Sequence, residues 1–423
     1  MRRQEVDLIV AHAAEIVTTT GRSLHPASGP QQSSITVIQD GAIAVRRGRI
    51  VQIGKTREIL SAYRSKHVID ASGKTALPGL VDPHTHLIFA GFRDKEFEMK
   101  LSGKTYMEIL AAGGGILSTV RETRRTGKHR LFEICRERAR SLLLHGTTTI
   151  EAKSGYGLNT AEEIKCLQVA RSLDRLGPFD VVPTFLGAHA IPEEYEGRAD
   201  EYVDLVIEEM IPKIAEKKLA RFCDVFCEKG VFTVEQSRRI LEAARQRGLK
   251  SKIHADEFAD TGGAALAAEI GAVSADHLLC SSDEGLGKMA GRGTVAVLLP
   301  AAPLTLMTSR YANARKMIEH SVPVAIGTDL SPSCMLESQQ MSIALACHFM
   351  RMTPAEAIVA ATINAAHAIC EASSVGSLEP GKKADITIID APNHRFLGYK
   401  FGVNLVETVI KNGEIVVQDH RLV

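Results

Sequence analysis

The chain has 423 residues, of which 45% are hydrophobic, so it is long enough to bury a large core. Its 51 Lys and Arg residues almost balance its 50 Asp and Glu residues, and no long basic block argues for nucleic acid or an anionic membrane. No run of about 18 apolar residues occurs that could cross a bilayer. We therefore expect a soluble protein that acts on a small molecule.

The N-terminal segment MRRQEVDLIVAHAAEIVTTTG is too polar for a signal peptide, because charged residues interrupt its apolar run. The eight cysteines follow no zinc-finger or disulfide-scaffold spacing. Reduced thiols are the simpler interpretation, so we expect the protein in the cytoplasm.

The N-terminal part of the chain predicts β-structure, with two short strands in residues 42–54 about a turn at Arg47-Gly48 and extended structure in 67–79. The C-terminal part has β-branched runs that are broken by Pro-Gly and Asn-Gly turns. Each end alone holds too few strands to enclose a core. We therefore expect residues 1–77 and 376–423 to pair into one small β-sandwich domain.

Between these ends, apolar strand-like runs alternate with helical patterns about eight times. The runs cover residues 79–86, 146–155, 179–189, 220–230, 249–257, 272–279, 293–300 and 322–330. Helical patterns at 160–177, which begins with a threonine cap, and at 233–248 separate some of them. Eight buried strands with helical connections predict an α/β fold, a (β/α)8 TIM barrel over residues 78–375.

Histidine and carboxylate side chains stand at the ends of these runs, where such a barrel carries its chemistry. His84 and His86 end the first run and would project to the same side of an extended strand. His254 ends the fifth run and Asp329 the eighth, and the first and eighth strands of a closed barrel are neighbours. Any one histidine could instead be a hydrogen-bonded core residue. Together, the four predict a catalytic metal site with a position open for water.

Glu257 and His277 are further candidates for the chemical step. We also count Asp329, one of the four candidate ligands, as a catalytic residue. Glu257 follows His254 by three residues and could take a proton from the attacking water and pass it to a leaving nitrogen. The alternative for Glu257 is a carboxylate near a helix N-terminus. His277 could polarise the carbonyl group under attack or stabilise the oxyanion.

These features resemble the amidohydrolase superfamily, in which a small β-domain precedes the His-x-His pair. Within it, the segments HTHLIFAGFRDKEFEMKLSGKTYMEILAAGGGILSTVRETR, KSGYGL, TFLGAHAIP, KIHADEF and SADHLL closely resemble the imidazolonepropionases. The resemblance spans essentially the whole chain. The single histidines are shared with many relatives, whereas KSGYGL, FLGAHA and the Gly-Gly-Gly segment are specific to this family.

The resemblance implies that the cyclic amide of 4-imidazolone-5-propanoate is hydrolysed to N-formimidoyl-L-glutamate in histidine degradation. It also implies one Zn²⁺ or iron ion per chain and a homodimer. The residues that it assigns to the substrate are Arg93, Tyr156, His189, Glu257, Tyr106, Ser331, Ser333 and Cys334. Arg93 could bind the propanoate through two parallel hydrogen bonds. Its alternative is a surface salt bridge with Asp94 or Glu96.

One short segment departs from the family. Imidazolonepropionases usually carry Asn-Pro-Gly and a small hydroxylated residue where this chain has Ser331, Pro332, Ser333 and Cys334. In the family these positions contact substrate or product, partly through backbone N–H groups at the start of a helix. The catalytic chemistry is therefore a firmer expectation than the substrate. A deaminase of the same superfamily, or a hydrolase of another small cyclic amide, is the alternative.

Two other possibilities are disfavoured. Relatives with two metals bridge them through a modified lysine on the fourth strand, but Lys229 follows the apolar part of the fourth run rather than lying within it. We therefore expect a single ion, with Lys153 as an ordered polar neighbour. A non-catalytic scaffold is disfavoured because all four candidate ligands and Glu257 are present.

Overall fold

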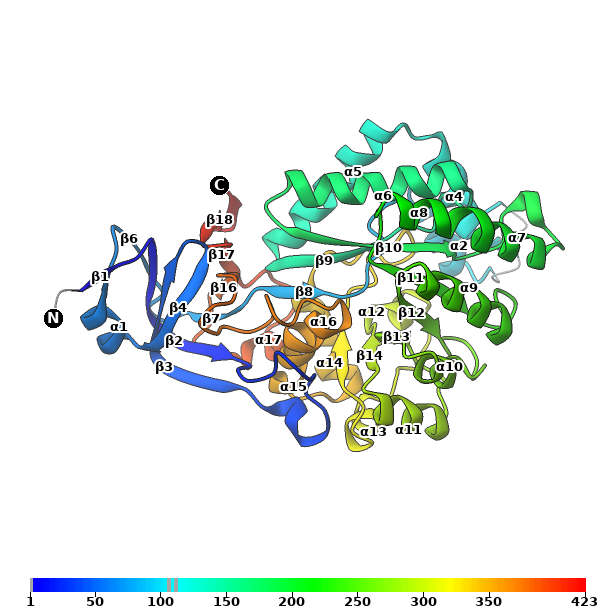
Figure 1. The fold of residues 1–423 in the computed structure, drawn as a ribbon. Coiled ribbons are helices and arrows are strands. Elements are labelled where there is room, and N and C mark those ends of the chain that lie inside the picture. The colour runs from blue at the N-terminus through cyan, green and yellow to red at the C-terminus, as the bar shows by residue number, and fades with distance from the viewer. Residues whose placement is uncertain (1–2, 105–107, 110–112) are drawn as a thin grey trace.

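The computed structural model describes residues 3–104, 108–109 and 113–423, and a parallel eight-stranded sheet forms its centre (Figure 1). The strands are β8 (Leu80–Asp82), β9 (Thr147–Lys153), β10 (Asp180–Ala188), β11 (Phe222–Cys227), β12 (Lys250–Ala255), β13 (Ser274–His277), β14 (Val295–Leu298) and β15 (Val324–Ile326). Each strand pairs with the next in chain order. All eight lie inside the predicted runs, so the (β/α)8 prediction is confirmed.

The first and last strands meet just beyond their C-terminal ends, which brings the sheet close to a closed barrel. Thr85 and Leu330 form an isolated parallel bridge. The backbone N–H of His86 donates to the carbonyl of Leu330 at 2.8 Å, and the N–H of Asp329 donates to the carbonyl of His84 at 3.2 Å. These bonds join the segments that carry three of the four candidate metal ligands.

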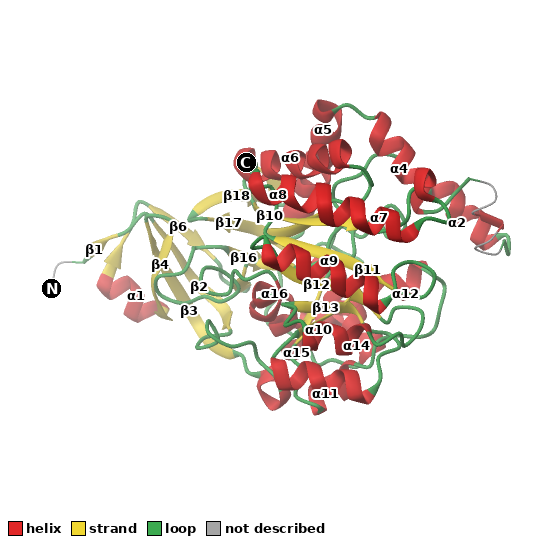
Figure 2. Cartoon of the chain, turned by 45° about the vertical axis from the view of Figure 1, so that its right-hand side comes forward, coloured by secondary structure: helices red, strands yellow, loops and turns green. Residues whose placement is uncertain are grey.

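Helices surround the barrel (Figure 2). They are α2 (Asp94–Leu101), α4 (Ile116–Arg125), α5 (Lys128–Leu144), α6 (Thr160–Leu176), α7 (Ala199–Leu205), α8 (Ile211–Glu216), α9 (Val234–Gln246), α10 (Gly263–Glu269), α11 (Asp283–Arg292), α12 (Ala301–Thr305), α13 (Ala314–Glu319), α14 (Gln339–Met350), α15 (Pro354–Ala361), α16 (Ile363–Ala368) and α17 (Phe396–Tyr399). Short helical turns lie at Gly29–Ser33 and Glu193–Tyr195, and a π-helical segment at Val206–Met210. None of the described helices has the length and apolar character that crossing a bilayer requires.

The N-terminal caps of α6 and α9 can be compared with the helical patterns predicted from the sequence. The prediction of a threonine cap for α6 is wrong, because Asn159 is the cap and its side chain accepts the backbone N–H of Glu162 at 3.0 Å. Helix α9 lies within the helical pattern predicted at 233–248, and Thr233 caps it by forming a reciprocal capping box with Gln236.

The two ends of the chain meet in a nine-stranded sheet, near which both termini lie in Figure 1. Its strands are β2 (Leu8–Thr18), β3 (Thr36–Arg46), β4 (Arg49–Lys55), β6 (His67–Asp70), β7 (Thr75–Pro78), β16 (Ile386–Ile389), β17 (Val406–Lys411), β18 (Glu414–Gln418) and β19 (Arg421–Leu422). Antiparallel pairing of β7 with β16 joins the two ends, as predicted. The domain limits proposed above stay a prediction.

Turn geometry agrees with the residues that form it. Arg47 and Gly48 have φ of 53° and 71°, and Asn412 and Gly413 have φ of 51° and 81°, as tight hairpin turns of this handedness require. The short strands β1 (Gln4–Glu5) and β5 (Tyr63–Arg64) pair separately. Helix α1 (Thr56–Ala62) lies in a region predicted only as β-structure, so that part of the prediction is wrong.

Candidate metal centre and active site

The four predicted metal ligands converge at the C-terminal end of the barrel. His84 Nε2 and His86 Nε2 each lie 3.6 Å from Asp329 Oδ1, and His254 Nε2 lies 3.2 Å from His86 Nε2. All four residues are buried. Donor atoms that hold one ion tetrahedrally at the usual bond lengths lie about 3.3–3.6 Å apart. The spacing is therefore that of one metal-binding cluster.

The protonation pattern of the histidines fits the same conclusion. His84 Nδ1 lies 2.6 Å from Asp276 Oδ2, and His254 Nδ1 lies 3.2 Å from Asp224 Oδ1. A carboxylate accepts a hydrogen bond, so each Nδ1 carries the proton and each Nε2 presents a lone pair. His84 Nε2 is buried and has no hydrogen-bond partner among the described residues. Such facing lone pairs are satisfied by a cation, so these residues fit a metal ion.

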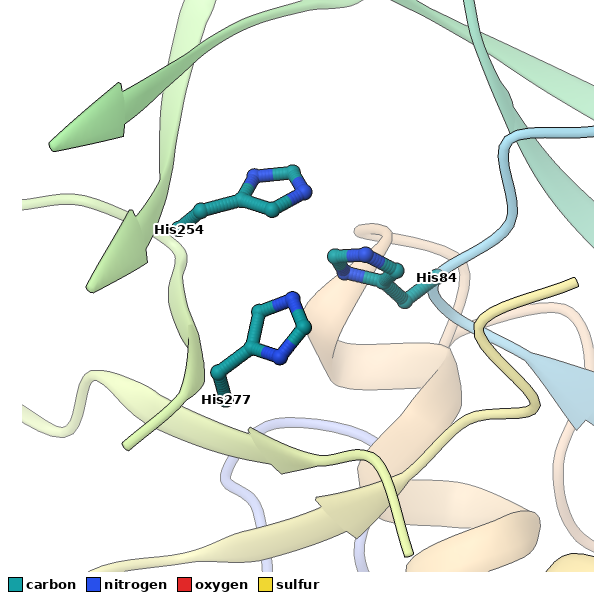
Figure 3. A group of neighbouring side chains, drawn as sticks. All are labelled: His84, His254 and His277. Carbon is teal, nitrogen blue, oxygen red and sulfur yellow. The ribbon is translucent and has the colours of Figure 1, made fainter. Parts of the chain in front are cut away.

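His277 also lies at this centre. Its ring nitrogen is grouped with those of His84 and His254, all within 4.8 Å of one another, and Figure 3 shows the three rings pointing toward a common space. His277 Nδ1 is 3.6 Å from Glu257 Oε1 and has no hydrogen-bond partner among the described residues. His277 therefore stands between the cluster and the candidate proton shuttle.

The backbone is strained where these side chains leave their strands. His277 and Asp329 have φ of 75° and 56°, in the left-handed region that side chains other than glycine rarely adopt. Each such residue costs about 1–3 kcal/mol, and residues of this kind are concentrated at functional sites. Asp256, with φ of 51°, turns the chain in the same way just before Glu257.

Glu257 is a buried carboxyl group beside the cluster. Burial raises the pKa of Glu257 well above its usual value, and the negative charges of Asp329 and Glu228 add to this effect. A cation bound next to it would oppose the shift. A carboxyl group with opposing influences of this kind is suited to take up and release a proton.

Two predicted substrate contacts line the other side of the cluster. The ring of His189 stacks on His86 with centroids 4.9 Å apart, and the ring of Tyr156 lies 5.1 Å from His189. Burial lowers the pKa of His189 to about 3, so its imidazole is neutral. Burial raises the pKa of Tyr156 far above neutrality, so its hydroxyl stays protonated and can donate.

A buried carboxylate fixes the loop that carries Tyr156. Glu163, on α6, accepts the backbone N–H groups of Gly155, Gly157 and Leu158 at 3.1, 2.7 and 2.9 Å. Gly155 has φ of 107°, a conformation that favours glycine, and its carbonyl contacts His189 Nδ1 at 3.0 Å. The loop therefore holds the two aromatic groups in one arrangement.

Arg93 forms the ion pair that was the alternative to substrate binding. Its Nη2 and Nε lie 2.6 and 2.8 Å from Glu96 Oε2. The pair is not a surface pair, however, because the Arg93 side chain is only 10% exposed. Glu96 also accepts the N–H of Gly115 at 2.9 Å, which anchors the start of α4. Burial raises the pKa of Tyr156, and the positive charge of Arg93 partly offsets that effect.

The residues at 331–334 form a closed turn. Ser331 and Cys334 exchange backbone hydrogen bonds of 2.9 and 3.1 Å, and Ser331 Oγ lies 3.3 Å from Ser333 Oγ. Cys334 is 1% exposed and packs with Ala301 and Leu345. Its thiol is thus turned into the core, which leaves Ser331 and Ser333 at the turn. The helix that follows, α14, begins only at Gln339, so this turn is not the helix start that the resemblance implies. The remaining predicted contact, Tyr106, lies outside the described residues.

Sequence reasoning identified only one of the charged residues beneath the cluster. Lys153, expected as an ordered polar neighbour, is fully buried and pairs with Glu151 and Asp224 at 2.9 and 2.8 Å. Asp224 and Asp276, which hold the histidine Nδ1 atoms, were not singled out. The available signal was the presence of charged residues inside otherwise apolar strands, as in FCDVFC of β11.

Comparisons with known proteins show the family of the chain. The model of the amidohydrolase family matches residues 75–416. The imidazolonepropionase of Geobacillus kaustophilus is 51% identical over 98% of this chain and 99% of its own length, and that of Brevibacillus brevis is 52% identical over 98% of both. The zinc-bound adenosine deaminase of Xanthomonas campestris shares the fold, with a TM-score of 0.72 and 20% identity over 100% of this chain and 95% of its own. The chain therefore belongs to the amidohydrolase family and, within it, to the imidazolonepropionases.

Proposed function

We propose that the chain hydrolyses the cyclic amide of 4-imidazolone-5-propanoate, giving N-formimidoyl-L-glutamate in histidine degradation. The observation that carries this proposal is the identity of about half, over essentially the full length, with proteins named imidazolonepropionase. The site agrees with such a reaction, since it combines a metal-binding cluster, a buried carboxyl group and cationic and hydroxyl donors.

We propose that His84, His86, His254 and Asp329 hold one ion per chain. Three imidazoles and one carboxylate suit Zn²⁺ and iron alike, so either ion is compatible with this donor set. When bound, such an ion supplies an acidified water and polarises the carbonyl group. The facing Nε2 lone pairs support this assignment.

The proton steps fall to Glu257 and His277. We propose that Glu257 accepts a proton from the attacking water and delivers it to the ring nitrogen as the amide C–N bond breaks. The 3.6 Å separation of Glu257 Oε1 from His277 Nδ1 lets the histidine share that proton or donate toward the carbonyl oxygen. One water is consumed, and its oxygen remains in the new carboxylate.

Arg93, Tyr156 and His189 are proposed to bind the substrate. Glu96 occupies one edge of the guanidinium, through Nε and Nη2, which leaves its other N–H groups for the propanoate. Tyr156 adds a protonated hydroxyl that can donate. The neutral ring of His189 donates through Nδ1 to the carbonyl of Gly155, so its Nε2 has a lone pair that can accept a hydrogen bond from the substrate. Ser331 and Ser333 complete this side of the site in the proposal.

Arg93→Ala is expected to raise KM by about 10–100-fold with little change in kcat, because a charge-assisted hydrogen bond to the substrate is lost while the metal ligands are untouched. Steady-state kinetics and metal analysis on the same sample measure this. Arg93→Ala leaves the Glu96 carboxylate without its ion-pair partner. The double variant Arg93→Ala/Glu96→Gln removes that charge and should show the same KM as Arg93→Ala. Arg238→Ala, which breaks a surface pair with Glu269, is the control. An unchanged KM in both Arg93 variants would limit Arg93 to a structural role.

The function itself is tested with freshly generated 4-imidazolone-5-propanoate. Loss of its ultraviolet absorbance with formation of formimidoyl-glutamate is the expected result. Ammonia release from amino-substituted rings, assayed in parallel, would instead identify a deaminase. A chain that holds one metal ion and turns over neither substrate would direct attention to other cyclic amides, since the 331–334 turn is the part that departs from the family.

We also propose, from the same resemblance, a homodimer in the cytoplasm. The eight cysteines are free in the structure, which suits a reducing compartment. Sedimentation equilibrium should give twice the chain mass of 45.8 kDa. A monomer at micromolar concentration would contradict the homodimer.

A further inference from the structure

Lys153 is the charged group that lies at the centre of the buried network beneath the metal-binding cluster. It stands at the end of β9, and its side chain is 0% exposed. Its Nζ lies 2.8 Å from Asp224 Oδ2, 2.9 Å from Glu151 Oε1 and 3.7 Å from Asp276 Oδ2. One ammonium group therefore faces three carboxylates from three different strands.

Two of these carboxylates hold metal-ligand histidines. Asp224 reaches His254 Nδ1 at 3.2 Å, and Asp276 reaches His84 Nδ1 at 2.6 Å. An outer carboxylate of this kind fixes both the tautomer and the ring orientation of a ligating histidine. Whatever holds the carboxylates therefore also sets the direction of the Nε2 lone pairs.

We infer that Lys153 is a positioning residue for the metal centre, which acts by holding Asp224 and Asp276 against His254 and His84. This inference rests on the proposed metal site. The third carboxylate links Lys153 to the His-x-His segment itself. Glu151 Oε2 accepts the backbone N–H of Thr85, the residue between the two histidines, at 3.2 Å.

Lys252, a second buried lysine close to Asp276, does not duplicate this arrangement. Lys252 Nζ donates to the carbonyls of Pro83 and Ala368 at 3.3 and 3.2 Å and lies 3.8 Å from Asp276 Oδ2. Among the ion pairs of the described residues, Asp224 is joined to Lys153 and His254. The two lysines face three carboxylates, so loss of Lys153 leaves a strong excess of buried negative charge.

The test therefore uses a charge-matched double variant, Lys153→Met/Glu151→Gln, which removes one positive and one negative charge. We expect a folded chain whose affinity for Zn²⁺ is lower by about 10–100-fold, as for loss of other outer partners of metal ligands. Competition with a chromophoric chelator measures the affinity. The absorption spectrum of the Co²⁺-loaded chain should shift, because the orientation of the histidine ligands changes.

Lys411→Met/Asp385→Asn is the matched control. Lys411 is a buried lysine on β17 of the nine-stranded sheet and pairs with Asp385 and Asp180 at 2.6 and 2.7 Å, so it tests the loss of a buried ion pair away from the site. Its Zn²⁺ affinity and Co²⁺ spectrum should equal those of the wild type. If the Lys153 double variant fails to fold, Lys153→Arg keeps the charge but displaces it, and the same losses are expected.

Wild-type affinity and an unchanged Co²⁺ spectrum in the Lys153 variant that folds would overturn the inference and leave Lys153 as a counter-charge for Glu151. The readouts use the metal alone, so they do not depend on the substrate. A wild-type chain that binds Zn²⁺ but does not open the imidazolone would contradict the proposed function and leave this test intact. A wild-type chain that binds neither Zn²⁺ nor Co²⁺ would overturn the metal centre and this inference together.

Discussion

Glu257→Gln is expected to keep the metal content of the wild type while kcat falls by about 10²–10⁴-fold, the usual contribution of a positioned general acid–base group. The amide has the size of the carboxyl group but cannot take a proton from the attacking water. Glu257 belongs to neither group of candidate ligand atoms, so the cluster stays complete. Single-turnover kinetics and metal analysis on the same sample measure the two effects separately.

Glu356→Gln provides the control for this substitution. Glu356 is also a buried carboxylate, but it pairs with Arg315 at 2.6 Å and caps α15 through the N–H of Thr353 at 2.7 Å. Its loss should lower stability and leave kcat unchanged. A Glu257→Gln chain with kcat close to wild type would remove Glu257 as the proton shuttle and leave His277 as the nearest candidate.

The barrel could be predicted because strands buried on both faces have a recognisable pattern. All six residues of β11 and all seven of β9 are buried, and such short apolar runs that end in polar residues are typical of parallel strands between helices. Helix α1 was missed because seven residues carry little periodicity. Asn159 and Thr160 can both cap a helix, and only the extended backbone at Asn159, with φ −149° and ψ 163°, decides between them.

The convergence of His84 and His86 was predicted from the alternation of side chains along a strand. In the structure β8 ends at Asp82, before either histidine. The bridge between Thr85 and Leu330 supplies the extended geometry instead. The two histidines therefore converge as predicted. The bridge to Leu330, in the segment that follows β15, holds this part of the chain, which lies beyond the end of β8.

The network beneath the cluster could not be predicted in the same way. Alternation places Glu151 and Lys153 on one side of β9. Which carboxylates meet Lys153 depends on the closure of the barrel, which brings Asp224 and Asp276 in from strands that are far apart in sequence. The orientation of Cys334 likewise depends on the turn that Ser331 closes with it. Such contacts follow from tertiary packing rather than from local patterns.

His254→Ala is expected to abolish both metal retention and turnover. Its Nε2 faces His86 Nε2 at 3.2 Å inside the cluster, so alanine removes one donor of the proposed four. Loss of an outer partner alone costs about 10–100-fold in metal affinity, and loss of a ligand should cost more. Metal analysis after gel filtration, together with a chelator competition assay and turnover of the imidazolone, measures the effect.

His394→Ala separates this effect from the loss of any buried histidine. His394 lies in the C-terminal part of the chain and is 8% exposed. Its Nδ1 pairs with Glu15 at 2.8 Å, as that of His254 pairs with Asp224, but His394 belongs to neither group of candidate metal ligands among the described residues. The His394→Ala variant should bind metal and turn over the imidazolone like the wild type. If His254→Ala instead folds and binds metal with wild-type affinity, the ion must be held by His84, His86 and Asp329, the other compact group of donors. His254 would then act on the substrate, and the network that links Asp224 to Lys153 would serve proton transfer rather than metal binding.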